Sequence, residues 1–223
     1  MRTKTLLIAA AALVAGVISS EAQVYSANVV GYVDVVITGA PVATNSYTLI
    51  SNPLDDGNGN QLTNIVGGLP AGSSVTTWAG TVFNTPIGKT AGGWSGSVSL
   101  PPGVGFFVKN GKASPASPPY TNVFVGNVVC LSGAYVTNVL VLGYNLCGSM
   151  VPYAGDLTTD TTNLNLQVPA QSSLTDWNPT TQTYDTPVGK TAGGWAGSFI
   201  INPGEGFFVK EGKYNTNWVQ TLP

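Results

Sequence analysis

The sequence predicts an all-β protein of two tandem homologous units, each a β-sandwich or barrel-like sheet, preceded by a signal peptide helix. The sequence contains an internal repeat: positions 83–112 match positions 184–213 at a constant offset of 101, with 20 of the 30 residues identical. Short runs of β-branched and aromatic residues are separated by Gly, Pro, Asn and Asp at intervals of roughly 8–12 residues, the spacing of sandwich and barrel strands. Charged residues make up 8% of the chain, against roughly 25% in an average globular protein.

The repeat places the first unit at residues 23–131 and the second at 132–223. A further match, LPAGSSVTTW with VPAQSSLTDW, runs at an offset of 99, and YTLI matches YNLC at an offset of 97. Repeats of this length are too long for a solenoid and indicate two related domains. The segments SSVTTW, VGFFVK, VFVGNVV and YVTNVLVLGYNL are expected to be strands, with short helices at Gln61–Val66 and Asp160–Asn165.

Residues 1–22 have the pattern of a secretory signal peptide. Arg2 and Lys4 precede the apolar stretch Leu6–Ile18, and Ser20-Glu21-Ala22 forms a cleavage site. The apolar stretch has 13 residues, whereas a membrane-spanning helix needs roughly 20. We therefore expect an exported protein, secreted or held at the cell surface, whose mature chain starts at Gln23 and has no membrane span.

The composition argues against several classes of function. Without Arg2, Lys4 and Glu21 the chain has six basic and nine acidic residues, so no basic surface is expected to hold nucleic acid. The sequence contains no His, the commonest general base and metal ligand near neutral pH. We therefore expect no catalytic residue set, no enzyme activity, no cofactor and no nucleic-acid partner.

The heptapeptide GKTAGGW occurs in both units and begins with Gly-Lys-Thr, the residues that end a phosphate-binding loop. That loop requires a glycine where Phe83 and Tyr184 stand, and a helix should follow it. Glycines follow instead, which disfavour a helix. The segment is predicted to be a turn that lays Trp94 and Trp195 against the sheet.

Aromatic residues at matching positions in both units are the expected core and turn residues. Matched positions favour core packing, although the tryptophans, together with Trp218 and several tyrosines, are also suited to stacking on sugar rings. The repeated residues are Trp78, Trp94, Phe106, Phe107, Trp177, Trp195, Phe207 and Phe208.

A leading strand, Val24–Ile37, precedes the first unit and is apolar on both faces, as a buried strand is. Asn28-Val29-Val30 resembles Asn127-Val128-Val129, whereas the C-terminal segment Thr216–Pro223 reads as a truncated copy. The leading strand is therefore expected to complete the second unit, either within one chain or in a neighbouring chain as a filament. Its expected assembly residues are Val24, Tyr25, Asn28, Val29, Val30, Tyr32 and Val33.

The segment LDDGNGNQL is a candidate calcium loop. Asp56, Asn58 and Asn60 stand at the first alternate positions of such a loop. Its sixth position lacks the glycine and its twelfth lacks the acidic residue. A polar turn is the favoured interpretation, with a weak calcium site as the alternative.

Cys130 and Cys147 are the only cysteines. In an exported protein two such residues are expected either to form a disulfide or to remain two small buried apolar side chains. Neither alternative is excluded by the sequence.

Three acidic residues are peculiar to the second unit. Asp176, Asp185 and Glu205 stand where the first unit has Thr77, Asn84 and Val104. Paired carboxylates can hydrolyse glycosidic bonds, but single polar substitutions on turns are also ordinary divergence between duplicated surfaces.

The export signal, VYSANVVGYV, NPLDDGNGNQL, GGW and PGxGFFV together resemble a group of secreted, functionally uncharacterised two-repeat β-proteins of Verrucomicrobia-type bacteria. The resemblance covers nearly all of the mature chain. It implies an exported two-unit β-protein and brings no catalytic residues.

These observations favour a structural or adhesive extracellular protein that associates with itself through β-edges or strand exchange, as a fibre or surface layer. A carbohydrate-binding module with a polysaccharide partner is the alternative from a different class. A glycan-active enzyme is a third.

Overall fold

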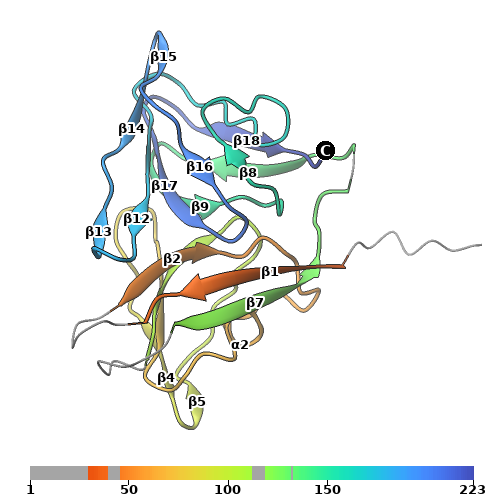
Figure 1. Cartoon of the computed structure of the whole chain (residues 1–223), viewed down its shortest axis with the longest axis vertical. Helices are drawn as coiled ribbons and strands as arrows, with labels where there is room; N and C mark the ends of the chain where they lie inside the picture. The colour runs from red at the N-terminus through yellow and green to blue at the C-terminus, as the bar shows by residue number, and fades with distance from the viewer. Residues whose placement is uncertain (1–29, 40–45, 112–118, 132) are drawn as a thin grey trace, which may run out of the picture.

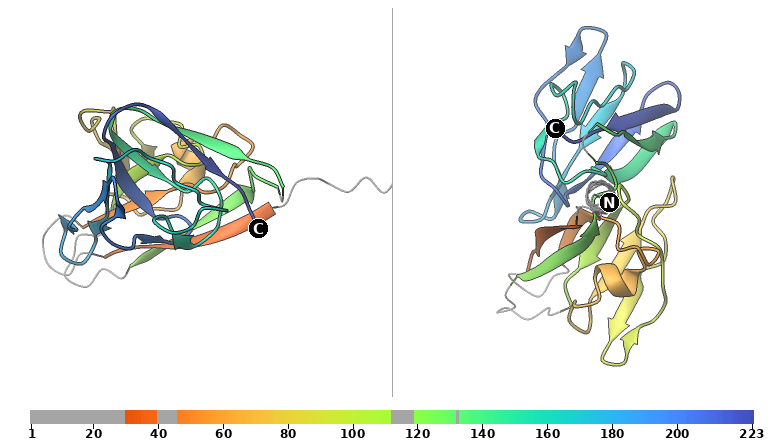
Figure 2. Two further views of the ribbon diagram at one scale, coloured as in Figure 1. Left: turned by 90° about the horizontal axis from the view of Figure 1, so that it is seen from above. Right: turned by 90° about the vertical axis from the view of Figure 1, so that its right-hand side faces the viewer.

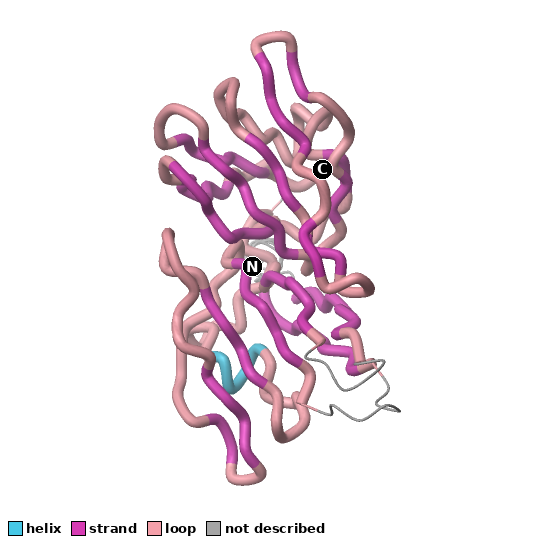
Figure 3. The backbone as a smooth tube through the Cα atoms, turned by 90° about the vertical axis from the view of Figure 1, so that its left-hand side faces the viewer, coloured by secondary structure: helices cyan, strands magenta, loops and turns pink. Residues whose placement is uncertain are grey.

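The computed structural model describes residues 30–39, 46–111, 119–131 and 133–223. Within these ranges the all-β prediction is confirmed: a single short α-helix accompanies eighteen strands (Figure 3). The predicted signal peptide and Val24, Tyr25, Asn28 and Val29 of the leading strand lie outside the described residues. No helix in the described part of the chain is long and apolar enough to cross a membrane.

The elements in chain order are β1 (Val30–Ile37), β2 (Tyr47–Ser51), α2 (Leu62–Ile65), β3 (Ser74–Thr77), β4 (Ile87–Thr90), β5 (Gly93–Trp94), β6 (Gly105–Lys109), β7 (Tyr120–Asn127), β8 (Val136–Leu140), β9 (Gly143–Gly148), β10 (Gly155–Asp156), β11 (Ser173–Thr175), β12 (Trp177–Asn178), β13 (Thr183–Tyr184), β14 (Val188–Thr191), β15 (Gly194–Trp195), β16 (Ile200–Ile201), β17 (Gly206–Glu211) and β18 (Thr216–Gln220).

Two five-stranded antiparallel sheets form the body of the molecule, one in the lower half of Figure 1 and one in the upper half. The first has the order β2-β6-β3-β4-β5 and the second has the order β9-β17-β11-β14-β15. Strands that match in the repeated sequence occupy the same place in each order. Two-stranded ribbons, β1-β7 and β8-β18, accompany the sheets.

The segment GFFVK forms the central strand β6 and recurs in β17. Alternate side chains of a strand point to opposite faces, and both faces of these strands are covered. Phe106 lies in the core of the lower half and Phe207 in the core of the upper half. Phe107 and Phe208 point the other way and meet in a third cluster with Leu49. This third cluster joins the two halves.

The GKTAGGW segments form hairpins at the two far ends of the molecule (Figure 1). Lys89 pairs with Trp94, and its ammonium lies 5.6 Å from the centre of the indole ring. Gly93 has φ +119° and Gly194 has φ +120°, a backbone conformation that glycine adopts without strain. These glycines allow the chain to double back in both halves.

The expected position of the leading strand is wrong. Its described part, β1, pairs along its whole length with β7 of the same half, and β8 fills the corresponding place beside β18. The C-terminal half is therefore already complete. Tyr32 and Val36 of β1 recur at an offset of 103 as Tyr135, just before β8, and Val139 of β8, so β1 corresponds to β8 and β7 to β18.

The expected burial of the leading strand on both faces is also wrong. Val35 and Ile37 are buried in the lower core, whereas Val30, Tyr32 and Val36 on the opposite face are exposed. The ribbon has only two strands and no layer packs on its outer face within the described residues. Its apolar outer residues therefore remain in solvent.

One of the two predicted helices forms. α2 lies within Gln61–Val66, whereas Asp160–Asn165 is a series of turns. The Asp160 carboxylate accepts hydrogen bonds from the backbone N–H groups of Thr162 and Asn163. Such bonds compete with helix formation.

Of the two alternatives for the cysteines, the structure has the second: Cys130 and Cys147 are free thiols buried in the upper core. The Cys130 thiol donates a hydrogen bond to the Ala134 carbonyl oxygen at 3.0 Å. Burial raises the pKa of the Cys147 thiol, and the nearby Glu211 carboxylate adds to that shift. Both side chains therefore serve as small apolar core residues.

The contact between the halves predicts the effect of adding a methyl group at Gly204. A Cβ atom there would lie 2.3 Å from the Val35 side chain, whereas a Cβ atom at Gly80 would meet nothing within 4 Å. Both glycines have positive φ, +84° and +91°. We expect Gly80→Ala to lower the free energy of unfolding by about 1 kcal/mol, and Gly204→Ala by a further 1–3 kcal/mol, roughly, from overpacking. Denaturant unfolding measures both variants, and equal losses would contradict this packing.

Candidate functional site

Two tryptophans hold the halves together by reciprocal ring contacts. Trp78 of the lower half lies edge-on to Phe208 of the upper half, with ring centroids 5.5 Å apart and an interplanar angle of 89°. Trp177 of the upper half lies edge-on to Phe107 of the lower half at 5.2 Å and 89°. These four residues define the junction. They are two pairs of equivalent positions in the sequence repeat.

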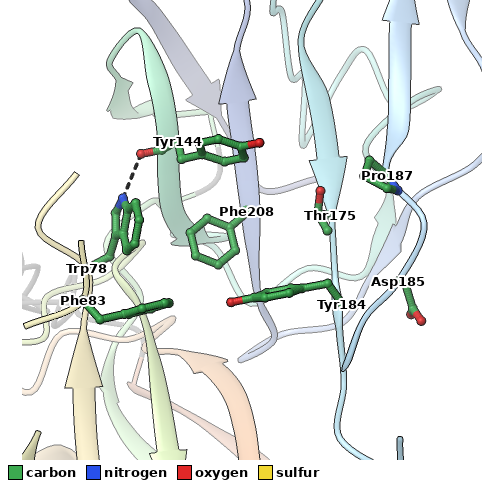
Figure 4. A pocket seen from close by; sticks show the side chains of 8 residues that line it. All are labelled: Trp78, Phe83, Tyr144, Thr175, Tyr184, Asp185, Pro187 and Phe208. Atoms are coloured by element: carbon green, nitrogen blue, oxygen red, sulfur yellow. Dashed lines mark hydrogen bonds between the residues drawn. The ribbon is translucent and has the colours of Figure 1, made fainter. Parts of the chain in front are cut away.

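Each junction tryptophan is also anchored by its indole N–H. Trp78 Nε1 donates to the backbone oxygen of Tyr144 at 2.9 Å (Figure 4), and Trp177 Nε1 donates to the backbone oxygen of Tyr47 at 2.9 Å. Tyr47 and Tyr144 are themselves equivalent in the repeat. Each contact that a residue of one half makes across the junction is therefore repeated by the equivalent residue of the other half. This is the pattern of a two-fold interface.

The backbone repeats this reciprocity. Ser51 N–H donates to Gly204 O at 2.8 Å, and the equivalent Gly148 N–H donates to Gly103 O at 3.1 Å. Close approach requires glycine here, because a Cβ atom on Gly148 would lie 2.7 Å from the Glu205 backbone oxygen. The two halves are therefore joined by main-chain hydrogen bonds as well as by aromatic packing.

Two open grooves flank the junction. Groove one has a volume of about 370 Å³ and groove two about 310 Å³. Figure 4 shows the side chains of groove one gathered from both halves around Phe208. Groove one is lined by Trp78, Phe83, Tyr144, Thr175, Tyr184, Asp185, Pro187 and Phe208. Groove two is lined by Tyr47, Thr76, Phe83, Asn84, Pro86, Phe107, Trp177 and Tyr184.

Every residue of groove one has its repeat equivalent in groove two. Phe83 and Tyr184 are equivalent to each other and line both grooves, so they form the wall between them. Asp185 of groove one corresponds to Asn84 of groove two. The two grooves therefore offer the same aromatic framework, with one carboxylate in place of one amide.

The wall between the grooves leaves ring surface free. The Tyr184 ring packs at 5.0 Å from Trp177 and at 5.8 Å from Phe208, yet 46% of the residue is exposed. Phe83 packs at 4.8 Å from Trp78 and is similarly exposed. The rings are therefore held in place while part of each remains available to a ligand.

The structure separates the aromatic residues that the repeat singles out. Phe106 and Phe207 are buried in the two cores, and Trp218 is fully buried with its indole N–H donating to Leu164 O. Trp94 and Trp195 are half-buried in the end hairpins. The four that line the grooves are Trp78, Phe107, Trp177 and Phe208.

Four aromatic residues of the grooves, Tyr47, Phe83, Tyr144 and Tyr184, are not among the site residues predicted from the sequence. Tyr47 and Tyr144 stand at matching positions, a signal that the repeat offers, whereas Phe83 and Tyr184 differ in type between the units. All four come together only when the halves pack across the junction.

The candidate calcium loop is a hydrogen-bonded turn. The Asp56 carboxylate accepts hydrogen bonds from the backbone N–H groups of Asn58 and Asn60 and from the Asn64 amide. Burial alone would raise the pKa of Asp56, but these hydrogen bonds lower it below its usual value. Within the described residues no group of three His, Cys, Asp or Glu side chains is placed to hold a metal ion.

The acidic residues of the second unit lie beside the grooves. Asp185 lines groove one, while Asp176 and Glu205 line a neighbouring pocket of about 280 Å³ together with Asp34 of β1. Burial, opposed by a hydrogen bond from the Trp177 backbone N–H and reinforced by the charges of Glu205 and Asp185, raises the pKa of Asp176 to about 6.

No family model, curated protein or solved structure matches the chain. Its function is therefore inferred from the geometry of the two grooves.

The raised pKa of Asp176 predicts a pH-dependent stability. Its folded-state pKa of about 6 exceeds the unfolded value of about 3.9, so the folded state favours the protonated carboxyl. The stabilisation of the folded state by the protonated Asp176 carboxyl is fully present below about pH 4 and is lost as the pH rises through about 6. The Asp176→Asn variant has no carboxyl group to ionise, so its stability does not fall with pH for this reason. Its free energy of unfolding, relative to that of the native protein, should therefore increase by about 1–2 kcal/mol between pH 4 and pH 8, after allowance for solvent screening.

Urea unfolding of both proteins at pH 4 and pH 8 checks this expectation. Asp185→Asn, which removes a nearby carboxylate charge and leaves Asp176 in place, is the comparison and should show a smaller change. A constant difference between Asp176→Asn and the native protein across this range would show that Asp176 titrates normally.

Proposed function

We propose that the chain consists of two tandem homologous units, exported by its N-terminal signal, and that it binds polysaccharide in the two grooves as an extracellular adhesive protein. The observation that carries the proposal is the pair of equivalent aromatic grooves at the junction. Part of each wall ring is exposed, and its position is set by packing from both halves.

The chemistry of the grooves suits sugar rings. A pyranose has an apolar face of C–H groups that packs on an aromatic ring, and a rim of hydroxyls that needs hydrogen-bonding partners. Groove one supplies Thr175, Tyr184 and Asp185 around its aromatic rings, and groove two supplies Thr76 and Asn84. No Lys or Arg is among the described residues that line either groove. An uncharged glycan therefore fits better than a sulfated or uronic one.

Two related grooves on one molecule also favour an adhesive role. A long polymer that occupies one groove raises the local concentration of its own segments near the other, so two weak sites act as one stronger site. The shared wall, Phe83 and Tyr184, brings the grooves next to each other.

A second candidate function, glycan hydrolysis, is favoured by one observation. Asp176 has a raised pKa and lines the same pocket as Glu205. Retaining and inverting glycosidases use one protonated and one ionised carboxyl group across the scissile bond. Release of reducing sugar that is lost in both Asp176→Asn and Glu205→Gln would establish hydrolysis, and binding without turnover would leave the adhesive function.

The groove wall gives the direct mutational test of binding. Tyr184→Ala removes a ring that lines both grooves, and we expect it to weaken binding to insoluble neutral polysaccharide roughly 5- to 30-fold. That is about 1–2 kcal/mol for the loss of an aromatic platform. Depletion assays with the mature protein measure the affinity.

Tyr214→Ala is the matched control, because Tyr214 is 59% exposed and lines neither groove. It should bind like the native protein. Equal binding by both variants, or no binding of the native protein to any neutral polysaccharide, would reject the grooves as the binding site.

A further inference from the structure

The outer face of the β1-β7 ribbon is apolar and uncovered within the described residues. Tyr32 pairs with Val125, and Asp34 pairs with Val123, so these four side chains share one face. Tyr32 is 75% exposed. The other large apolar side chains of this face are Val30 and Val36. The outer face of an antiparallel ribbon in water is normally polar, so this one indicates an interaction surface.

The β8-β18 ribbon carries a second face of the same kind. Thr137 pairs with Val219, and Val139 pairs with Asn217. Tyr135, just before β8, is 73% exposed, and Val139 is exposed as well. The exposed Tyr32 and Val36 of β1 therefore recur, exposed, as Tyr135 just before β8 and Val139 within it. Single exposed apolar residues need no explanation, but the same pair exposed in both copies does.

The area of these faces is enough for a specific contact between chains. Five exposed Val and Tyr side chains present on the order of 500 Å² on the β1-β7 face. Two faces pressed together then bury roughly 1,000 Å² in all, the lower limit for a specific protein–protein interface. Two packed sheets of this kind form a sandwich about 10 Å thick.

The charge of Asp34 favours packing of the β1-β7 face on the β8-β18 face over packing on its own copy. Asp34 lies in the middle of the β1-β7 face. Packing this face on its own copy would bring two Asp34 carboxylates into a closed interface, which is unfavourable. The described part of the β8-β18 face has no acidic side chain and offers Thr137 and Asn217 as hydrogen-bond donors. The β1-β7 face is therefore complementary to the β8-β18 face.

The two faces lie on opposite sides of the molecule. In the right-hand view of Figure 2 the orange and green β1-β7 ribbon lies on one side of the lower half, and the teal and dark-blue β8-β18 ribbon lies on the other side of the upper half. A contact between unlike faces leaves one free face at each end of a dimer, so further copies can add and extend an open chain of subunits.

We propose that a second copy of this protein is the partner of both faces, with the β1-β7 ribbon of one copy packed on the β8-β18 ribbon of the next, so that the protein assembles head to tail into filaments. This assembly does not exchange strands, because both ribbons are already paired within each chain. It is independent of the proposed glycan binding.

The test uses one charge on each face of the mature full-length protein. Tyr32→Lys blocks the β1-β7 face and Val139→Lys blocks the β8-β18 face. Sedimentation velocity should show native protein whose average mass rises steadily with concentration beyond that of a dimer. Each variant alone should remain a single chain. An equimolar mixture of the two should form one heterodimer and stop, because each variant retains the face that the other lacks.

Ile200→Lys, at a residue 68% exposed outside both ribbons, is the control and should assemble like the native protein. Dimers of Val139→Lys alone would show that like faces pair, which overturns the head-to-tail contact. Native protein that stays a single chain up to about millimolar concentration would overturn the interface altogether.

Discussion

The reciprocal packing of Trp78 on Phe208 and of Trp177 on Phe107 is the interaction on which the rest of the structure depends. An edge-to-face aromatic pair contributes about 0.5–1.5 kcal/mol beyond its buried area, and here two such pairs act across one junction. The indole N–H of each tryptophan is bonded to a backbone oxygen of the opposite half. The rings therefore cannot rotate without breaking a hydrogen bond. Fixed rings are what turn the space on either side of the junction into two grooves of definite shape.

The junction constrains the backbone as strongly as the side chains. A Cβ atom on Gly206 would lie 2.7 Å from the Ile50 oxygen, and a Cβ atom on the equivalent Gly105 would lie 2.9 Å from the Cys147 nitrogen. Both glycines begin the GFFVK strands, so the segment PGxGFFVK combines three requirements. It provides the turn before the strand, the bare backbone at the junction, and one phenylalanine for each side of the sheet. This explains why it is among the best matched parts of the two units.

The sequence predicts most of the fold and part of the site. All-β structure, the strand character of GFFVK and the doubling back at GKTAGGW follow from local patterns that glycine conformation and side-chain alternation dictate. The strand with which the leading strand pairs does not follow from such local patterns. Only three identical positions, such as Tyr32 and Tyr135, link β1 to the segment at β8, and they stand at an offset of 103 that the main repeat does not share. Local sequence patterns do not predict the grooves either, because Phe83 contacts Phe208 only through the packing of segments that are 125 residues apart in the chain.

The central claim, that the grooves beside the junction hold a glycan, is tested most directly by the indole N–H resonances of the five tryptophans. In a titration with soluble neutral oligosaccharides, followed by NMR of indole-labelled protein, Trp78 and Trp177 should shift because they line the grooves. Trp218, buried in the upper core, and Trp94 and Trp195, in the end hairpins, should stay in place. Shifts confined to Trp94 and Trp195, or no shift of any indole at saturating polysaccharide fragments, would contradict the account.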